Sequence, residues 1–101
     1  MTVVRLSERA ERQLDAILDF LQINAGPLVF NRHEDGFNDL FDRLQDTPKI
    51  GANRSEFGEG IKLSMVTRYL VFHRYHAELD EVEIITIRDG SRRELKQSNF
   101  S

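Results

Sequence analysis

The stretch of residues 17–41, "ILDFLQINAGPLVFNRHEDGFNDLF", decides the fold of this 101-residue chain. Gly26 readily takes the left-handed conformation that ends helices, and Pro27 fits the first turn of a new one, so the two residues predict a break between two helices. Because the connection is so short, we expect the two helices to pack side by side in opposite directions, as a hairpin.

Each predicted helix carries one apolar stripe at spacings of three and four residues, with charged residues on its other faces. Ser7 precedes the first helix as a candidate N-cap, and Pro48 stops the second. The stripes consist of Ala10, Leu14, Ile17, Leu18 and Leu21 in the first helix, and of Phe30, Phe37, Leu40, Phe41 and Leu44 in the second.

The strand-like segments lie on either side of this hairpin. One precedes it at 3–6, and the others follow at 61–66, 69–75 and 81–88, with a loop at 48–60, a tight turn at Thr67 and Arg68, and a short last helix from Ser91 to Lys96. The order is β-α-α-β-β-β. It predicts a single domain over 1–101 of the α+β class, in which the short N-terminal strand and the helical hairpin pack on a small antiparallel sheet.

Composition narrows the classes of function. The chain has no cysteine and a net charge of −3. We therefore expect no disulfide, metal or other cofactor, and no direct sequence-specific DNA binding, because nucleic-acid-binding domains are usually basic. Neither a signal peptide nor a membrane span is evident, which favours a cytoplasmic protein without a membrane partner. Residues 1–48 sum to −4 and residues 49–101 to +1, so any cationic surface belongs to the second half.

Cations interrupt the strand "RYLVFHRY", residues 68–75. Successive side chains of a strand point to opposite faces, so Leu70, Phe72 and Arg74 should share one face, and Tyr69, Val71, His73 and Tyr75 the other. If the hairpin covers one face, the other can carry polar groups. We expect Lys62, His73 or Arg74, and Arg88 to meet across neighbouring strands.

These segments resemble the ParE branch of the ParE/RelE family of toxins from bacterial toxin–antitoxin modules. The residues that carry the resemblance are "LSERAERQLDAILDFL" at 6–21, "RLQDTPKIG" at 43–51, "RYLVFHRY" at 68–75 and "ITIRDGSRREL" at 85–95. They span nearly the whole chain, and their order and spacing are more specific than any one motif. The sequence departs from the family pattern at Lys62, His73 and Asp89, and it is less basic than most members.

The resemblance implies a non-catalytic toxin that inhibits DNA gyrase by binding and forms a hetero-oligomer with a cognate ParD-like antitoxin. The antitoxin is expected to fold on binding, with an apolar helix beside the hairpin and an added strand at a sheet edge. The implied target-binding residues are Lys62, Arg74, Arg88, Arg92 and Arg93. The implied antitoxin-binding residues are Leu14, Leu18, Leu21, Phe37 and Phe41, unless the internal core uses them.

Two other functions stay open at the level of sequence. One is a RelE-like, ribosome-dependent mRNA endoribonuclease, which would use Lys62, Arg68, His73, Arg74 and Arg88. The other is a non-toxic family member that acts only as an antitoxin partner. The cations also have simpler explanations: His73 as a hydrogen-bonded sheet residue, His76 as a solvated loop residue, and Arg74 as the partner of Glu83 across the sheet.

Overall fold

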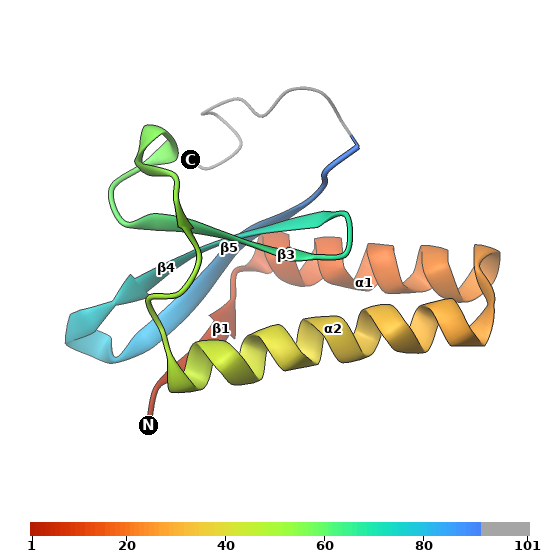
Figure 1. The fold of residues 1–101 in the computed structure, drawn as a ribbon, viewed down its shortest axis with the longest axis horizontal. Coiled ribbons are helices and arrows are strands. Elements are labelled where there is room, and N and C mark those ends of the chain that lie inside the picture. Colours follow the sequence, from red (N-terminus) through yellow and green to blue (C-terminus); the bar gives the residue numbers. More distant parts are fainter. Residues whose placement is uncertain (92–101) are drawn as a thin grey trace.

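The computed structural model describes residues 1–91. Within them a helical hairpin packs on one face of a five-stranded sheet, which confirms the α+β class (Figure 1). Arg92, Arg93 and the helix expected from Ser91 to Lys96 lie outside the described residues, apart from Ser91 itself. The elements are β1 (Val3–Leu6), α1 (Glu8–Asn24), α2 (Gly26–Asp46), β2 (Ala52–Asn53), the 3-10 turn η1 (Ser55–Phe57), β3 (Ile61–Val66), β4 (Tyr69–His76), the 3-10 turn η2 (Ala77–Leu79) and β5 (Glu81–Asp89).

The helix ends form where the sequence predicted them. The Ser7 hydroxyl accepts a hydrogen bond from the Ala10 amide at 3.0 Å and donates one to the Ile85 carbonyl at 2.8 Å, so one side chain caps α1 and fastens it to β5. Gly26 has φ +82°, and Pro27 lies in the first turn of α2. The hairpin prediction is confirmed.

The sheet has the order β1-β5-β4-β3-β2 and is mixed. The expectation of a wholly antiparallel sheet was wrong for one pair, because β1 runs parallel to β5. After β1 the helical hairpin crosses the sheet, and the chain returns to the position beside β1 only with β5. The first strand in the sequence therefore pairs with the last one. Asp80 holds this junction: its carboxylate accepts hydrogen bonds from Thr2 at 2.6 Å and Tyr75 at 2.9 Å, which together lower its pKa.

The segment predicted as a loop contains two short elements. β2 pairs with Lys62 and Leu63 of β3, and η1 follows it. The Phe57 ring of η1 meets the Phe72 ring edge to face, with centroids 5.6 Å apart. Phe72 has no exposed surface although it points away from the helices. The 3-10 turn η1 therefore covers part of the face opposite the hairpin.

The core lies between the hairpin and the sheet. Its buried members are Ala10, Phe37, Leu40, Leu44, Val66, Tyr69, Val71, Val82, Ile84 and Ile87. Gly36 of α2 allows a close approach of the two layers, because a Cβ there would lie 2.8 Å from Val66 Cγ1. Burying apolar area between the layers is the main stabilising contribution.

Along the last part of β5, α1 replaces β1 as the neighbouring element. β1 pairs only as far as Leu6 with Ile84. Beyond that point the Gln13 side chain of α1 accepts two hydrogen bonds at Oε1, from the Ile87 amide at 2.8 Å and from the Thr86 hydroxyl at 3.0 Å. A helix side chain thus satisfies a strand edge that would otherwise be unpaired.

Candidate functional site

The two faces of β4 differ as the alternation predicted. Tyr69 and Val71 belong to the core beneath the hairpin, and His73 shares their face and is wholly buried. Leu70, Phe72 and Arg74 point to the opposite side. We call this side the open face; its members include Leu63, Met65, Leu70, Phe72, Arg74, Glu83 and Arg88, as the pairing register of β3, β4 and β5 shows.

A β-bulge places Arg88 on the open face. Phe72 pairs with Thr86 while His73 pairs with Ile84, so β5 has one extra residue, Ile85, at this point. An extra residue reverses the alternation beyond it. Arg88 therefore pairs with Leu70 and shares a face with Arg74, whereas strict alternation from Glu83 would have turned Arg88 toward the hairpin.

Arg74 is only partly exposed and has no charged partner. It pairs in register with Glu83, but no ion pair or side-chain hydrogen bond joins the Arg74 guanidinium to any described residue, and its Nε atom is buried without a partner. The guanidinium group lies against Gly58, where an added Cβ would come within 2.9 Å of Nη2. The alternative interpretation of Arg74 as an ion-pair partner of Glu83 is therefore wrong, although the two residues do pair in register.

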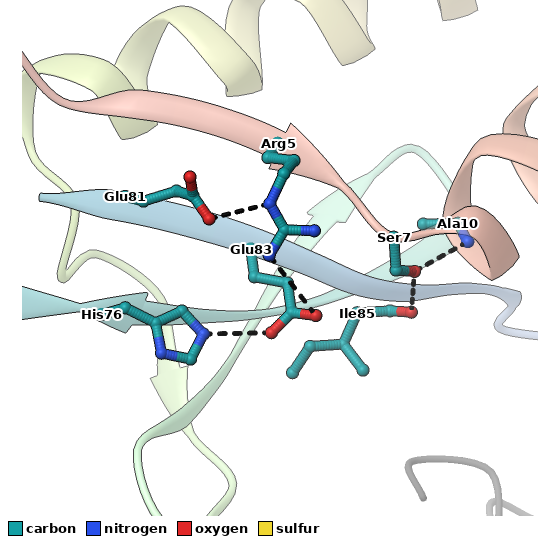
Figure 2. Close-up of polar contacts among 7 residues, drawn as sticks. All are labelled: Arg5, Ser7, Ala10, His76, Glu81, Glu83 and Ile85. Atoms are coloured by element: carbon teal, nitrogen blue, oxygen red, sulfur yellow. Dashed lines mark hydrogen bonds and ion pairs between the residues drawn. The ribbon is translucent and has the colours of Figure 1, made fainter. Parts of the chain in front are cut away.

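The Glu83 carboxylate contacts two other side chains, His76 and Arg5, as Figure 2 shows. The His76 Nε2 atom lies 3.0 Å from its Oε1 atom, and Arg5 Nη2 lies 3.9 Å from its Oε2 atom. Arg5 also donates from Nε to Glu81 at 2.8 Å, and this hydrogen bond raises the pKa of Arg5. His76 is thus not the solvated loop residue that we expected, because it ends β4 and is three-quarters buried beside Glu83.

His73 and Lys62 lie on the hairpin side of the sheet, directly across from each other. The Ser64 hydroxyl lies 2.9 Å from His73 Nε2. Burial, and secondarily the charge of Lys62, lowers the pKa of His73 to about 4, so the imidazole is neutral near pH 7. This agrees with the simpler interpretation of His73 as a hydrogen-bonded sheet residue.

Arg68 stands apart from the other cations, in the turn between β3 and β4. It stacks over Tyr69 with the guanidinium carbon 5.3 Å from the ring centroid, and it forms an ion pair with Asp89 at 3.3 Å. Its hydrogen bond to the Tyr69 hydroxyl, then the nearby negative charges, raise its pKa. Two recesses of about 430 and 400 Å³ flank Arg68, and Phe20 of α1 lines both.

The cations proposed for a nuclease therefore do not converge. Lys62 and His73 lie on the side of the helical hairpin, and Arg74 and Arg88 lie on the open face. Arg68 lies in the turn between β3 and β4. Among residues 1–91, His, Asp and Glu side chains form no group of three that could hold a metal ion. Within the same residues, no helix combines the length and apolarity needed to cross a membrane.

The expected antitoxin groove is largely part of the core. Phe37 and Leu21 are buried, Leu14 and Phe41 pack against the core cluster, and Leu18 is half-buried. The apolar side chains exposed on the hairpin are instead Phe20, Ile23 and Leu28, near its far end. They were not assigned to the apolar stripes, but Phe20 follows Ile17 by three residues, so spacing alone does not separate it from the core.

Within residues 1–91, a helical hairpin closes one face of the sheet, and the other face carries Arg74 and Arg88 without an ion-pair partner; the fold is that of a small α+β protein. Comparison with known proteins identifies the family to which the chain belongs. The family of ParE toxins of type II toxin–antitoxin systems, parDE, matches residues 4–94, and the chain belongs to this family.

A chain in the solved structure of the chromosomal ParDE toxin–antitoxin system from P. aeruginosa has a similar fold. The two chains superpose with a TM-score of 0.69 and 21% sequence identity, over 88% of this chain and 96% of the other. No curated protein matches the sequence.

Proposed function

We propose that this protein is the toxin of a type II module, that it inhibits DNA gyrase by binding, and that a ParD-like antitoxin neutralises it in the cytoplasm. The observation that carries this proposal is the separation of its cations across two faces of the sheet. Cleavage of RNA needs a base, an acid and cations around one phosphate. Binding needs only a surface, and the open face offers one.

The position of His73 supports binding over nuclease activity. A general base must reach the proton that it removes. His73 has no exposed surface and contacts Ser64 beneath the hairpin, so an RNA strand on the open face would be separated from it by the sheet. Arg74 and Arg88 remain as contacts for gyrase. Lys62 would take part only at the sheet edge, where it contacts Asn53 of β2.

The antitoxin surface that we propose is the far end of the hairpin. Phe20, Ile23 and Leu28 have exposed fractions of 54%, 81% and 81%. The recesses beside Phe20 could receive apolar side chains of an amphipathic segment that folds on binding. Of the five residues expected from the sequence, Leu18 and the accessible parts of Leu14 and Phe41 would extend this contact.

The proposal is tested with purified protein in two assays. Gyrase holoenzyme is titrated with the protein while the supercoiling of relaxed plasmid is followed, and a translating extract is examined for cleaved mRNA. We expect supercoiling to stop while mRNA stays whole. Ribosome-dependent cleavage that is lost in His73→Ala would refute the proposal. Normal growth of bacteria that express the chain alone at a high level would show instead a member without toxicity.

A further inference from the structure

The arginines of the sheet fall into two groups. Arg5 and Arg68 each form an ion pair, with Glu81 and Asp89 respectively. Arg74 and Arg88 form none with any residue in 1–91, although carboxylates lie on neighbouring strands. A partly buried cation that stays without a partner is costly, so both positions are suited to an anion that another molecule supplies.

The spacing of these two arginines is fixed by the sheet. Arg88 pairs with Leu70, which lies four residues before Arg74 on β4. Four residues of strand and one step between strands place the two Cα atoms about 14 Å apart. Side chains four residues apart in an extended chain span almost the same distance and point to the same side.

The exposed surface beside them is apolar, and between them lies Phe72, which the Phe57 ring covers. Leu70 and Leu63 are half-buried, and Met65 is 57% exposed. Protein interfaces combine such apolar patches with arginine. A nucleic acid would instead favour a basic domain, whereas this chain carries a net charge of −3.

Part of the Arg74 side chain is buried and packs against Gly58 before any partner arrives. Gly58 has φ +147°, and its backbone lies against the guanidinium group in a space that a Cβ would fill. A side chain that is already ordered loses less conformational entropy on binding. Gly58 therefore contributes to the site through the absence of a side chain.

We propose that the open face binds an acidic protein segment that presents two carboxylates about 14 Å apart, with an apolar residue between them. In an extended segment this corresponds to acidic residues four positions apart. Arg74 and Arg88 receive the carboxylates, and Leu70, which pairs with Arg88, contacts the apolar residue. The inference rests on the proposed function only in taking this face as the one that meets the target.

The direct test uses a synthetic probe, independent of gyrase. A fluorescein-labelled extended peptide with two glutamates four residues apart around a central leucine is compared by fluorescence anisotropy with the same peptide carrying two glutamines. We expect the full chain to bind the glutamate peptide at least tenfold more tightly. Arg74→Met and Arg88→Met, which keep an apolar stem, should each remove this preference, while Arg12→Met on the exposed side of α1 should keep it.

Three outcomes would overturn the inference. The first is equal binding of the two peptides. The second is tighter binding of a 20-nucleotide single strand, lost in the two variants, which would assign the face to nucleic acid. The third is a fall of more than about 5 °C in the melting temperature of either variant, which would show a partner inside the chain. If gyrase is unaffected but the peptide preference holds, the proposed function fails and this inference stands.

Discussion

Replacing Gln13 by alanine tests how α1 completes the sheet. The Gln13 Oε1 atom accepts hydrogen bonds from the Thr86 hydroxyl and the Ile87 amide. Thr86 has no exposed surface and Ile87 is 2% exposed. In Gln13→Ala both donors lose their acceptor, and water that enters the recess lined by Gln13 and Ile87 offsets part of the loss.

The magnitude follows from the two orphaned donors. Each buried donor without a partner costs about 1–3 kcal/mol, and partial relaxation brings the expected loss of unfolding free energy to about 2–4 kcal/mol. For a domain of this size, that loss lowers the melting temperature by roughly 10–20 °C. In a Thr86→Val background only the Ile87 amide is orphaned, so the same substitution should cost about half as much.

Urea unfolding and hydrogen exchange provide the assay. Gln22→Ala, at an exposed position of the same helix, is the matched control and should change stability by less than about 0.5 kcal/mol. The Ile87 amide should exchange faster in Gln13→Ala than in the control. A loss below about 1 kcal/mol with unchanged exchange at Ile87 would refute the assignment of Gln13 as an edge cap.

Three further predictions concern the core and the open face. Because the pKa of His73 is lowered to about 4 from about 6.5 in the unfolded chain, the unfolded state binds the proton first. The stability present above pH 6.5 should therefore fall by about 3 kcal/mol toward pH 4, and urea titrations of His73→Gln should lack this slope; an equal slope in both proteins would contradict the assignment. Gly36→Ala should destabilise by about 1–2 kcal/mol despite its better helix propensity, because the new Cβ meets Val66, and Val66→Ala should relieve this cost in the double variant; a gain in stability would show that the layers are not in contact there. Arg5→Ala should cost less than about 1 kcal/mol in thermal unfolding because the Arg5 side chain is half exposed, and a larger loss would give its ion pairs a structural role that this exposure does not support.

Local signals in the sequence were sufficient to predict the helical hairpin. Ser7, Gly26 and Pro27 set the helix ends through short-range geometry, and the structure keeps all three roles. The parallel pairing of β1 with β5 has no such signal, because it joins residues nearly the whole chain apart. The two-residue strand β2 is too short to show any periodicity.

The candidate site was predictable only in part, for two physical reasons. The faces of β4 follow from alternation, but one extra residue at Ile85 decides the face of Arg88, and a continuous apolar run does not reveal a bulge. On the helices, apolar type alone cannot tell which side chains the core uses. α1 and α2 project beyond the sheet (Figure 1), so Phe20 and Leu28 stay exposed while Phe37 is buried.

Site-specific photo-cross-linking tests most directly whether the open face meets the target. A photoreactive amino acid is placed at Met65, which is exposed on the open face, or at Glu34, which is exposed on α2, and each protein is irradiated with gyrase holoenzyme. We expect a covalent adduct from position 65 and none from position 34. An adduct from position 34 alone would contradict this expectation and would place the target on the helical hairpin.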